Sequence, residues 1–144
     1  MGVDYYAYSL LGIKVAHAKL FKEDTVRGCS HDINIQDGTK FCPECGMEIW
    51  ETISVPLDEA ARENGEYDNE CFGFDLITDY SGDIAYIGNI TGNTDAYSPA
   101  IITRFYSDKL YVDQIEDRLK SSLDPFGLWD ANEFGLWTIM QVSG

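Results

Sequence analysis

The chain has 144 residues, of which 44% are hydrophobic and 13% aromatic, and this composition is typical of one folded domain rather than of a disordered segment. Its formal net charge of −15 excludes ready binding to nucleic-acid phosphates and favours basic partners. No apolar run approaches the roughly 18–20 residues that cross a bilayer, and the N-terminus lacks the basic region of a signal peptide. We therefore expect a single domain over residues 1–144, without a membrane partner, in the cytoplasm (the host cytoplasm if the protein is viral).

The charge is distributed unevenly along the chain. Residues 1–40 hold five acids and five bases, whereas residues 41–144 hold 20 acids and five bases, so the second segment carries the whole net charge. An acidic surface can simply aid solubility. It can also bind a basic protein, and the densest acidic run supplies the candidate partner-binding residues: Asp58, Glu59, Glu63, Glu66, Asp68 and Glu70.

The first elements in chain order are strands on either side of an irregular loop. Residues 3–15 alternate with period two and are rich in β-forming residues, which predicts a long strand. Residues 28–46 are interrupted by glycines and cysteines and predict a metal-binding loop. Alternation resumes over residues 47–55 and predicts a strand that Pro56 ends.

A short helix and a hairpin are predicted next. Residues 57–64 are helix formers followed by Gly65, a common residue after a helix C-terminus. Residues 72–78 and 83–90 are rich in aromatic and branched side chains and flank the sequence Asp-Tyr-Ser-Gly, which predicts a β-hairpin.

The C-terminal part predicts a loop, a strand, a helix and a last strand. Residues 91–99 carry Gly, Asn, Asp and Pro and predict a loop, and residues 101–106 predict a strand. The helix is expected over residues 108–123, with Ser107 as its N-cap. The final strand is expected over residues 134–142.

The apolar stripe of the predicted helix recurs every three to four residues. Its members are Tyr111, Val112, Ile115, Leu119 and Leu123. Together these elements predict an α+β fold, with a mostly antiparallel sheet, about two helices and a zinc-binding loop inserted at residues 28–46.

Four residues in the loop have the spacing of metal ligands. Cys29 and His31 form a C-x-H pair, and Cys42 and Cys45 form a C-x-x-C pair. Zinc prefers four such ligands in a tetrahedron, and pairs on tight turns supply two ligands at a time. A set of four protein ligands leaves no position for water, so it indicates a structural zinc ion.

The segment Phe41-Cys-Pro-Glu-Cys-Gly46 resembles the rubredoxin-type knuckle of zinc ribbons. Pro43 restricts the turn, and Gly46 can adopt the positive φ that points backbone N–H groups at the thiolates. The resemblance covers residues 29–46, departs from the ribbon pattern at C-x-H, and implies metal binding rather than an activity.

Other uses of the cysteines remain open from sequence. Cys42 and Cys45 could form a disulfide or a redox pair, and Cys71 could replace His31 as the fourth ligand. We expect instead that Cys71 is a buried free thiol beside Phe72.

Catalytic signatures fail to match. The zinc deaminase pattern needs H-x-E followed by P-C-x-x-C, but Ile33 stands where the Glu is required and Pro43 lies inside the cysteine pair. An enzyme would have to use carboxylates such as Asp75, Asp79 or Asp83 with Tyr86, in a pocket that holds a second metal. A solvated acidic face is the simpler interpretation of these carboxylates.

The function expected from sequence is non-enzymatic binding of a basic protein surface, with carboxylates taking the place of phosphates to inhibit a nucleic-acid-binding protein. In overall character the chain is similar to small acidic accessory proteins of bacteriophages that carry a zinc knuckle. The alternatives are a metal-dependent enzyme with a carboxylate-lined site, or a structural subunit that oligomerises through exposed Tyr97, Trp129 and Trp137.

Overall fold

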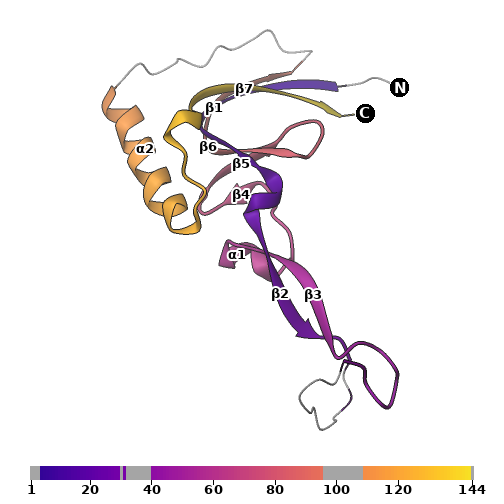
Figure 1. Cartoon of the computed structure of the whole chain (residues 1–144). Helices are drawn as coiled ribbons and strands as arrows, with labels where there is room; N and C mark the ends of the chain where they lie inside the picture. The colour runs from indigo at the N-terminus through magenta and orange to yellow at the C-terminus, as the bar shows by residue number, and fades with distance from the viewer. Residues whose placement is uncertain (1–3, 30, 32–39, 96–108, 144) are drawn as a thin grey trace.

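The computed structural model describes residues 4–29, 31, 40–95 and 109–143. They form a body and an arm that projects from it (Figure 1). In chain order the elements are β1 Asp4–Ala16, η1 His17–Leu20, β2 Phe21–Arg27, β3 Trp50–Pro56, α1 Glu59–Arg62, β4 Glu70–Cys71, β5 Phe74–Thr78, β6 Ile84–Asp95, α2 Lys109–Leu123, η2 Asp124–Phe126, η3 Ala131–Glu133 and β7 Phe134–Ser143. We call residues 21–56 the arm and the remainder the body.

The body is an antiparallel five-stranded sheet in the order β4-β5-β6-β1-β7, with α2 packed against it. Alternation along β1 places Leu11, Ile13 and Val15 in the cluster that α2 covers. The helix contributes buried residues of the predicted stripe: Ile115, Leu119 and Leu123. The predicted α+β class with a mostly antiparallel sheet is confirmed.

The opposite face of the sheet has a smaller cluster and is curved. Leu10, Ile77 and Ile139 form this cluster although they come from three different strands. The side-chain amide of Gln141 on β7 donates to the Thr78 carbonyl on β5 at 2.8 Å. Because β6 and β1 lie between these two strands in the sheet order, the sheet must curl to bring them together.

At the base of the arm, a joint centred on Tyr67 links the body residues that flank the arm by hydrogen bonds and contacts the arm itself through an aromatic ring. The Tyr67 hydroxyl donates to the Leu20 carbonyl at 2.7 Å and accepts from the Asp58 N–H at 3.1 Å. The Phe21 ring packs edge-on against Tyr67, with centroids 5.4 Å apart. Burial raises the pKa of Tyr67 to about 12, so this hydroxyl stays protonated and keeps donating at neutral pH.

Most predicted elements are confirmed, but two local predictions are wrong and one strand was not predicted. The strand after the metal loop begins at Trp50 rather than Met47, and β2 was not predicted. Residues 91–95, predicted as loop, extend β6 because they continue its pairing with β1. The predicted strand at 101–106 and the N-cap Ser107 lie outside the described residues. No helix in the described part of the chain is both long and apolar enough to cross a membrane.

Candidate metal centre

The arm is a two-stranded ribbon with little core of its own. β2 and β3 pair in antiparallel register from Phe21 opposite Pro56 to Arg27 opposite Trp50. Most of their side chains are exposed. An isolated two-stranded hairpin is at best marginally stable in water, so the far end of this ribbon needs another source of stability.

Gly28 leads the chain into the ligand region, at a position with no room for a side chain. The Gly28 N–H donates to the Ile49 carbonyl at 2.7 Å, which extends the hydrogen bonding between β2 and β3 by one residue pair. A Cβ on Gly28 would lie 2.3 Å from the Glu48 carbonyl oxygen, so no other residue fits without moving the backbone. This close approach places Cys29 directly at the end of the ribbon.

The second pair of ligands lies on a tight turn closed by backbone hydrogen bonds. The Cys42 N–H donates to the Met47 carbonyl at 2.7 Å, and the Gly46 N–H donates to the Cys42 carbonyl at 2.8 Å. Gly46 has φ +73°, as predicted for the residue after the second cysteine. The turn therefore has the backbone form that the knuckle resemblance implied.

The structure brings all four predicted ligands together. The three sulfur atoms and one imidazole nitrogen, from Cys29, His31, Cys42 and Cys45, lie within 4.8 Å of one another. Metal–ligand bonds of about 2.3 Å for sulfur and 2.0–2.1 Å for nitrogen, at tetrahedral angles, would separate S and N by about 3.6 Å. The Cys42 Sγ and His31 Nδ1 atoms are 3.6 Å apart, so this donor set fits a metal ion.

The electrostatics of the turn favour thiolates at one cysteine and oppose them at another. Desolvation raises the pKa of Cys42, but hydrogen bonds from the N–H groups of Cys45 and Glu44 and from the thiols of Cys29 and Cys45 together lower that pKa to about 7. At Cys45 the Met47 N–H lowers the pKa, yet desolvation and the neighbouring thiols of Cys42 and Cys29 raise it overall. Three thiolates so close repel each other, and a central cation would remove that repulsion.

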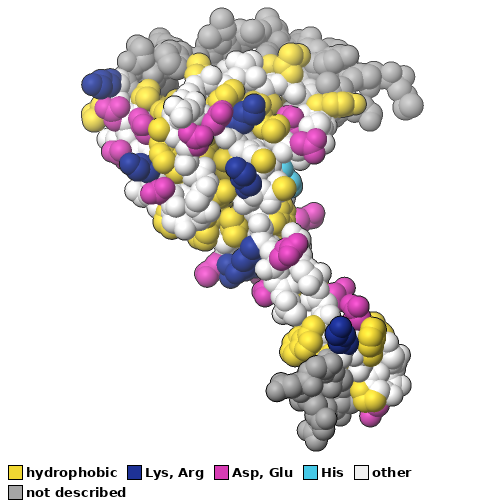
Figure 2. Space-filling view, viewed as in Figure 1, with side chains coloured by type: hydrophobic (Ala, Val, Ile, Leu, Met, Phe, Trp, Pro, Cys, Tyr) yellow, Lys and Arg dark blue, Asp and Glu magenta, His cyan; other side chains and the backbone are white. Residues whose placement is uncertain are grey.

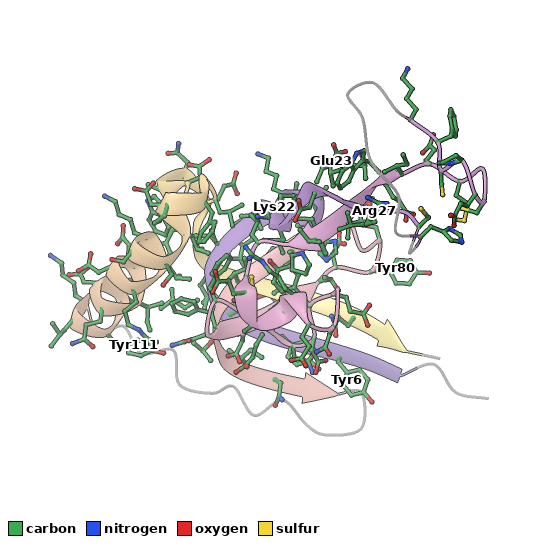
Figure 3. All side chains as sticks on the ribbon, turned by 90° about the horizontal axis from the view of Figure 1, so that it is seen from below. Tyr6, Lys22, Glu23, Arg27, Tyr80 and Tyr111 are labelled. Atoms are coloured by element: carbon green, nitrogen blue, oxygen red, sulfur yellow. The ribbon has the colours of Figure 1, made fainter. Side chains whose placement is uncertain are left out.

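Arg27 holds the first ligand pair in place. Its Nε donates to the Cys29 carbonyl at 3.3 Å, and its Nη2 donates to the His31 carbonyl at 3.1 Å. The guanidinium also lies over the Trp50 ring, 5.8 Å from its centroid. Figure 3 shows Arg27 on the arm beside the sulfur-bearing side chains. Sequence reasoning missed this role, because only the pairing of β2 with β3 sets Arg27 opposite Trp50.

A carboxylate lies beside the other ring nitrogen of His31. The Glu44 Oε2 is 3.7 Å from the His31 Nε2, while the His31 Nδ1 faces the Cys42 thiol. Carboxylates in this position orient metal-bound imidazoles and fix their tautomer. Glu44, the second variable residue of the C-x-x-C pair, is thus placed to support the least conventional of the four ligands.

The proposed substitute ligand lies elsewhere. Cys71 is fully buried in the body cluster beneath α2 and is not among the four grouped ligands. Burial raises the pKa of its thiol to about 12. Cys71 is therefore the buried thiol that sequence favoured, and its alternative role as a ligand is wrong. The other histidine, His17, packs its ring against Phe21 with centroids 5.3 Å apart.

The acidic candidates divide into one structural residue and several exposed ones. Asp58 caps α1 by accepting from the Ala60 N–H at 3.1 Å, and its other oxygen accepts from the Phe72 N–H at 2.7 Å. Both oxygens of this half-buried carboxylate therefore accept backbone hydrogen bonds within the body. The remaining candidates are exposed around α1 and the connection to β4: Glu59, Glu63, Glu66, Asp68 and Glu70.

Two of the carboxylates considered for catalysis, Asp75 and Asp79, have different structural settings. Asp75 and Asp68 line an open cleft of about 330 Å³, and the Asp75 carboxylate accepts from the Ile90 N–H at 2.9 Å. Asp79 instead organises the β5–β6 turn by accepting from the Ser81 hydroxyl at 2.8 Å and from the Ile84 N–H. These hydrogen bonds lower the pKa of Asp79, and the bond from Ser81 has the largest effect.

The two tryptophans considered for oligomerisation are half-buried. Trp137 donates from its indole nitrogen to the carbonyls of Gly12 and Glu133, at 3.2 and 3.1 Å. Trp129 packs against Phe134, with ring centroids 5.8 Å apart. Both tryptophans therefore belong to the body, and the prediction that they are exposed is wrong. Tyr97 lies outside the described residues.

Acidic side chains are spread over both the body and the arm on the face shown in Figure 2, interleaved with lysines and arginines. They do not form a single stripe on that face. At the end of the arm, apolar groups flank a basic side chain in the same view. An acidic contact surface on this face would therefore have to be a small group of carboxylates, because the face as a whole is not uniformly acidic.

Comparison with protein-family models, with curated proteins and with solved structures found no match to this chain. The similarity to bacteriophage accessory proteins gains no support from these comparisons. The metal centre therefore stands on its four ligands, their spacing and the backbone around them.

Proposed function

We propose that the protein is a non-enzymatic binding protein whose projecting arm is completed by one structural zinc ion. The observation that carries this proposal is a set of four grouped protein ligands at the end of a ribbon with little core. Three thiolates and one imidazole suit zinc better than the hard cations Mg²⁺ and Ca²⁺. Four protein ligands leave no coordination position for a reacting water, so the ion supports shape rather than chemistry.

The partner we propose is a protein with a basic surface. The net charge of −15 attracts such a surface over long range, and exposed acids around α1 place part of that charge at the base of the arm. A nucleic-acid-binding protein is the class whose surface fits best, because carboxylates can occupy positions that phosphates normally fill. Inhibition of that protein in the cytoplasm, as by a phage accessory protein, would follow from occupying its binding surface.

The zinc part of the proposal is tested by metal analysis of the purified chain. We expect one zinc ion per chain, and cobalt substitution should give the absorption bands of a tetrahedral site with thiolate ligands. Replacement of Cys42 by Ser should abolish both, whereas replacement of Cys71 by Ser should leave both intact. Zinc absent from the wild type, or lost from the Cys71 variant alone, would contradict the assignment.

The partner part is tested with a basic protein recovered on the immobilised chain and then purified. Its dissociation constant should rise steeply with salt, because the contact is electrostatic. The double variant Glu63→Gln/Glu66→Gln should bind more weakly than Asp113→Asn/Asp117→Asn, which removes the same charge from exposed positions on α2. Salt-independent binding, or equal effects of the two variants, would count against an acidic surface at the base of the arm.

A further inference from the structure

The arm tip carries exposed apolar side chains that the metal centre does not use. Phe41, Met47 and Trp50 are 56%, 57% and 50% exposed, although all three are large and hydrophobic. They fall within ten residues that also contain Cys42 and Cys45. We infer that these three side chains are the central contact of the proposed interaction, and that the partner has an apolar pocket bordered by basic side chains. This inference rests on the proposed function and specifies its partner.

The residue types and their setting favour contact with a protein. Aromatic residues, methionine and arginine are enriched in protein interfaces, and a buried tryptophan is a common source of binding energy. Trp50 is held against Arg27, which is itself held by the Cys29 carbonyl. A ring that is already ordered loses less conformational entropy when it binds.

The charges around these side chains determine the border of the pocket. In the sequence, Glu44 and Glu48 lie between the apolar residues and Glu51 follows Trp50; all three carboxylates are exposed, and Lys40 is the exposed lysine within the described residues 40–51. Arg27 is occupied by backbone carbonyls and by Trp50. We call these three carboxylates the acidic rim of the tip; a partner that covers the apolar side chains would lie close to them, so lysine or arginine at the border of its pocket would be complementary. The same rim disfavours a nucleic acid.

The ligands and the contact surface depend on the same backbone. Met47 accepts the N–H of Cys42, and Ile49 donates to the Lys40 carbonyl, so the ligand turn sets the positions of Phe41 and Met47. Ile49 is fully buried with Cys29 and Cys42, directly before Trp50. Loss of the ion would release these constraints, so binding at the tip should require metal.

The test selects peptides from a random displayed library on the full, zinc-loaded chain. We expect the enriched sequences to combine apolar residues with lysine or arginine. Synthetic versions should bind wild type and Tyr80→Ala equally, since Tyr80 is an 82% exposed aromatic on the body (Figure 3). Trp50→Ala and Met47→Ala should weaken binding about ten-fold or more, and chelation should abolish it.

Two measurements keep a failed variant informative. The cobalt spectrum shows whether the metal site of each variant is intact, and Met47→Ala keeps the backbone carbonyl that Cys42 uses. Three outcomes would overturn the inference. The selected peptides could lack basic residues, they could bind Trp50→Ala as tightly as wild type, or the selection on wild type could show no enrichment over a selection on Trp50→Ala. Tip-dependent dimerisation in sedimentation, or tip-dependent binding of an oligonucleotide, would overturn it in favour of another occupant.

The outcomes also separate this inference from the proposed function. Peptides that are basic, salt-sensitive and weakened by Glu63→Gln/Glu66→Gln but not by Trp50→Ala would retain the basic partner and reject the tip as its central contact. Peptides that respond to neither set of variants would reject both.

Discussion

The body and the arm of this protein are stabilised by different physical means. The body buries two hydrophobic clusters, one beneath α2 and one within the curve of the sheet. Near the arm tip the only cluster among the described residues comprises Cys29, Cys42 and Ile49. Since each fully buried large aliphatic side chain contributes about 1.5–3 kcal/mol, burial can stabilise the body but supplies little at the tip. The four ligands therefore lie in the region where hydrophobic burial contributes least to stability.

This difference shows why a metal site belongs on the arm. Structural zinc contributes on the order of 10–16 kcal/mol in peptides at neutral pH, which exceeds what Ile49 can supply. With an ion bound to the grouped ligands, the ribbon would have an ordered structure at both ends, the metal centre at one and the Tyr67 joint at the other. The comparison predicts that either region can be weakened while the other stays folded.

Metal removal should have the largest effect and should be confined to the arm tip. Chelation, or Cys42→Ser, should remove hydrogen-exchange protection from the amides of Gly28, Cys42 and Ile49, because their hydrogen bonds depend on the ligand turn. Amides of β1 and β6 should keep their protection and serve as an internal control. Unchanged protection at the tip, or simultaneous loss in the body, would contradict two separate sources of stability.

Truncation in the helix cluster should weaken only the body. Leu119 is fully buried, so Leu119→Ala should lower the free energy of unfolding by about 2–5 kcal/mol in denaturant titrations. Gln114→Ala, at an exposed position of the same helix, should stay within about 0.5 kcal/mol of wild type. Cobalt affinity should match wild type in both variants, and a large fall in the Leu119 variant would show that the regions are coupled.

The close approach of the β1 and β6 backbones can be tested at a glycine. A Cβ on Gly12 would lie 2.0 Å from the Ile87 carbonyl oxygen, so Gly12→Ala should cost about 1–3 kcal/mol through a forced backbone shift. At Gly135, on the neighbouring strand β7, a Cβ would meet nothing within 4 Å. Gly135→Ala is therefore the matched control, and thermal midpoints that fall equally in both variants would contradict a clash specific to Gly12.

The smallest effect is expected at the base of the arm. Asp58→Ala removes the α1 cap and the acceptor of the Phe72 N–H, and should cost about 0.5–2 kcal/mol in denaturant titrations. Its neighbour Glu59 is exposed, so Glu59→Ala should change stability little. If the two substitutions had equal effects on stability, the structural role of Asp58 would be wrong.

Features that depend on short spacing along the chain could be predicted from the sequence. The four ligands follow from two close pairs, the stripe of α2 follows from helical periodicity, and the β5–β6 hairpin follows from its turn residues. In each case the residues that act together are near neighbours in the chain, so local rules suffice. Gly46 belongs with them, because its position after the second cysteine demands a positive φ.

The contacts between distant segments could not be predicted from the sequence and are seen in the tertiary structure. β2 was missed because the arm buries neither of its faces, so the segment Phe21–Arg27 lacks the alternation that marks a half-buried strand. Residues 91–95 carry turn-forming residues but are strand because β1 pairs with them. Long-range strand pairing also sets three features that local spacing does not encode: the role of Arg27, the partial burial of Trp137 and the separation of Cys71 from the ligands.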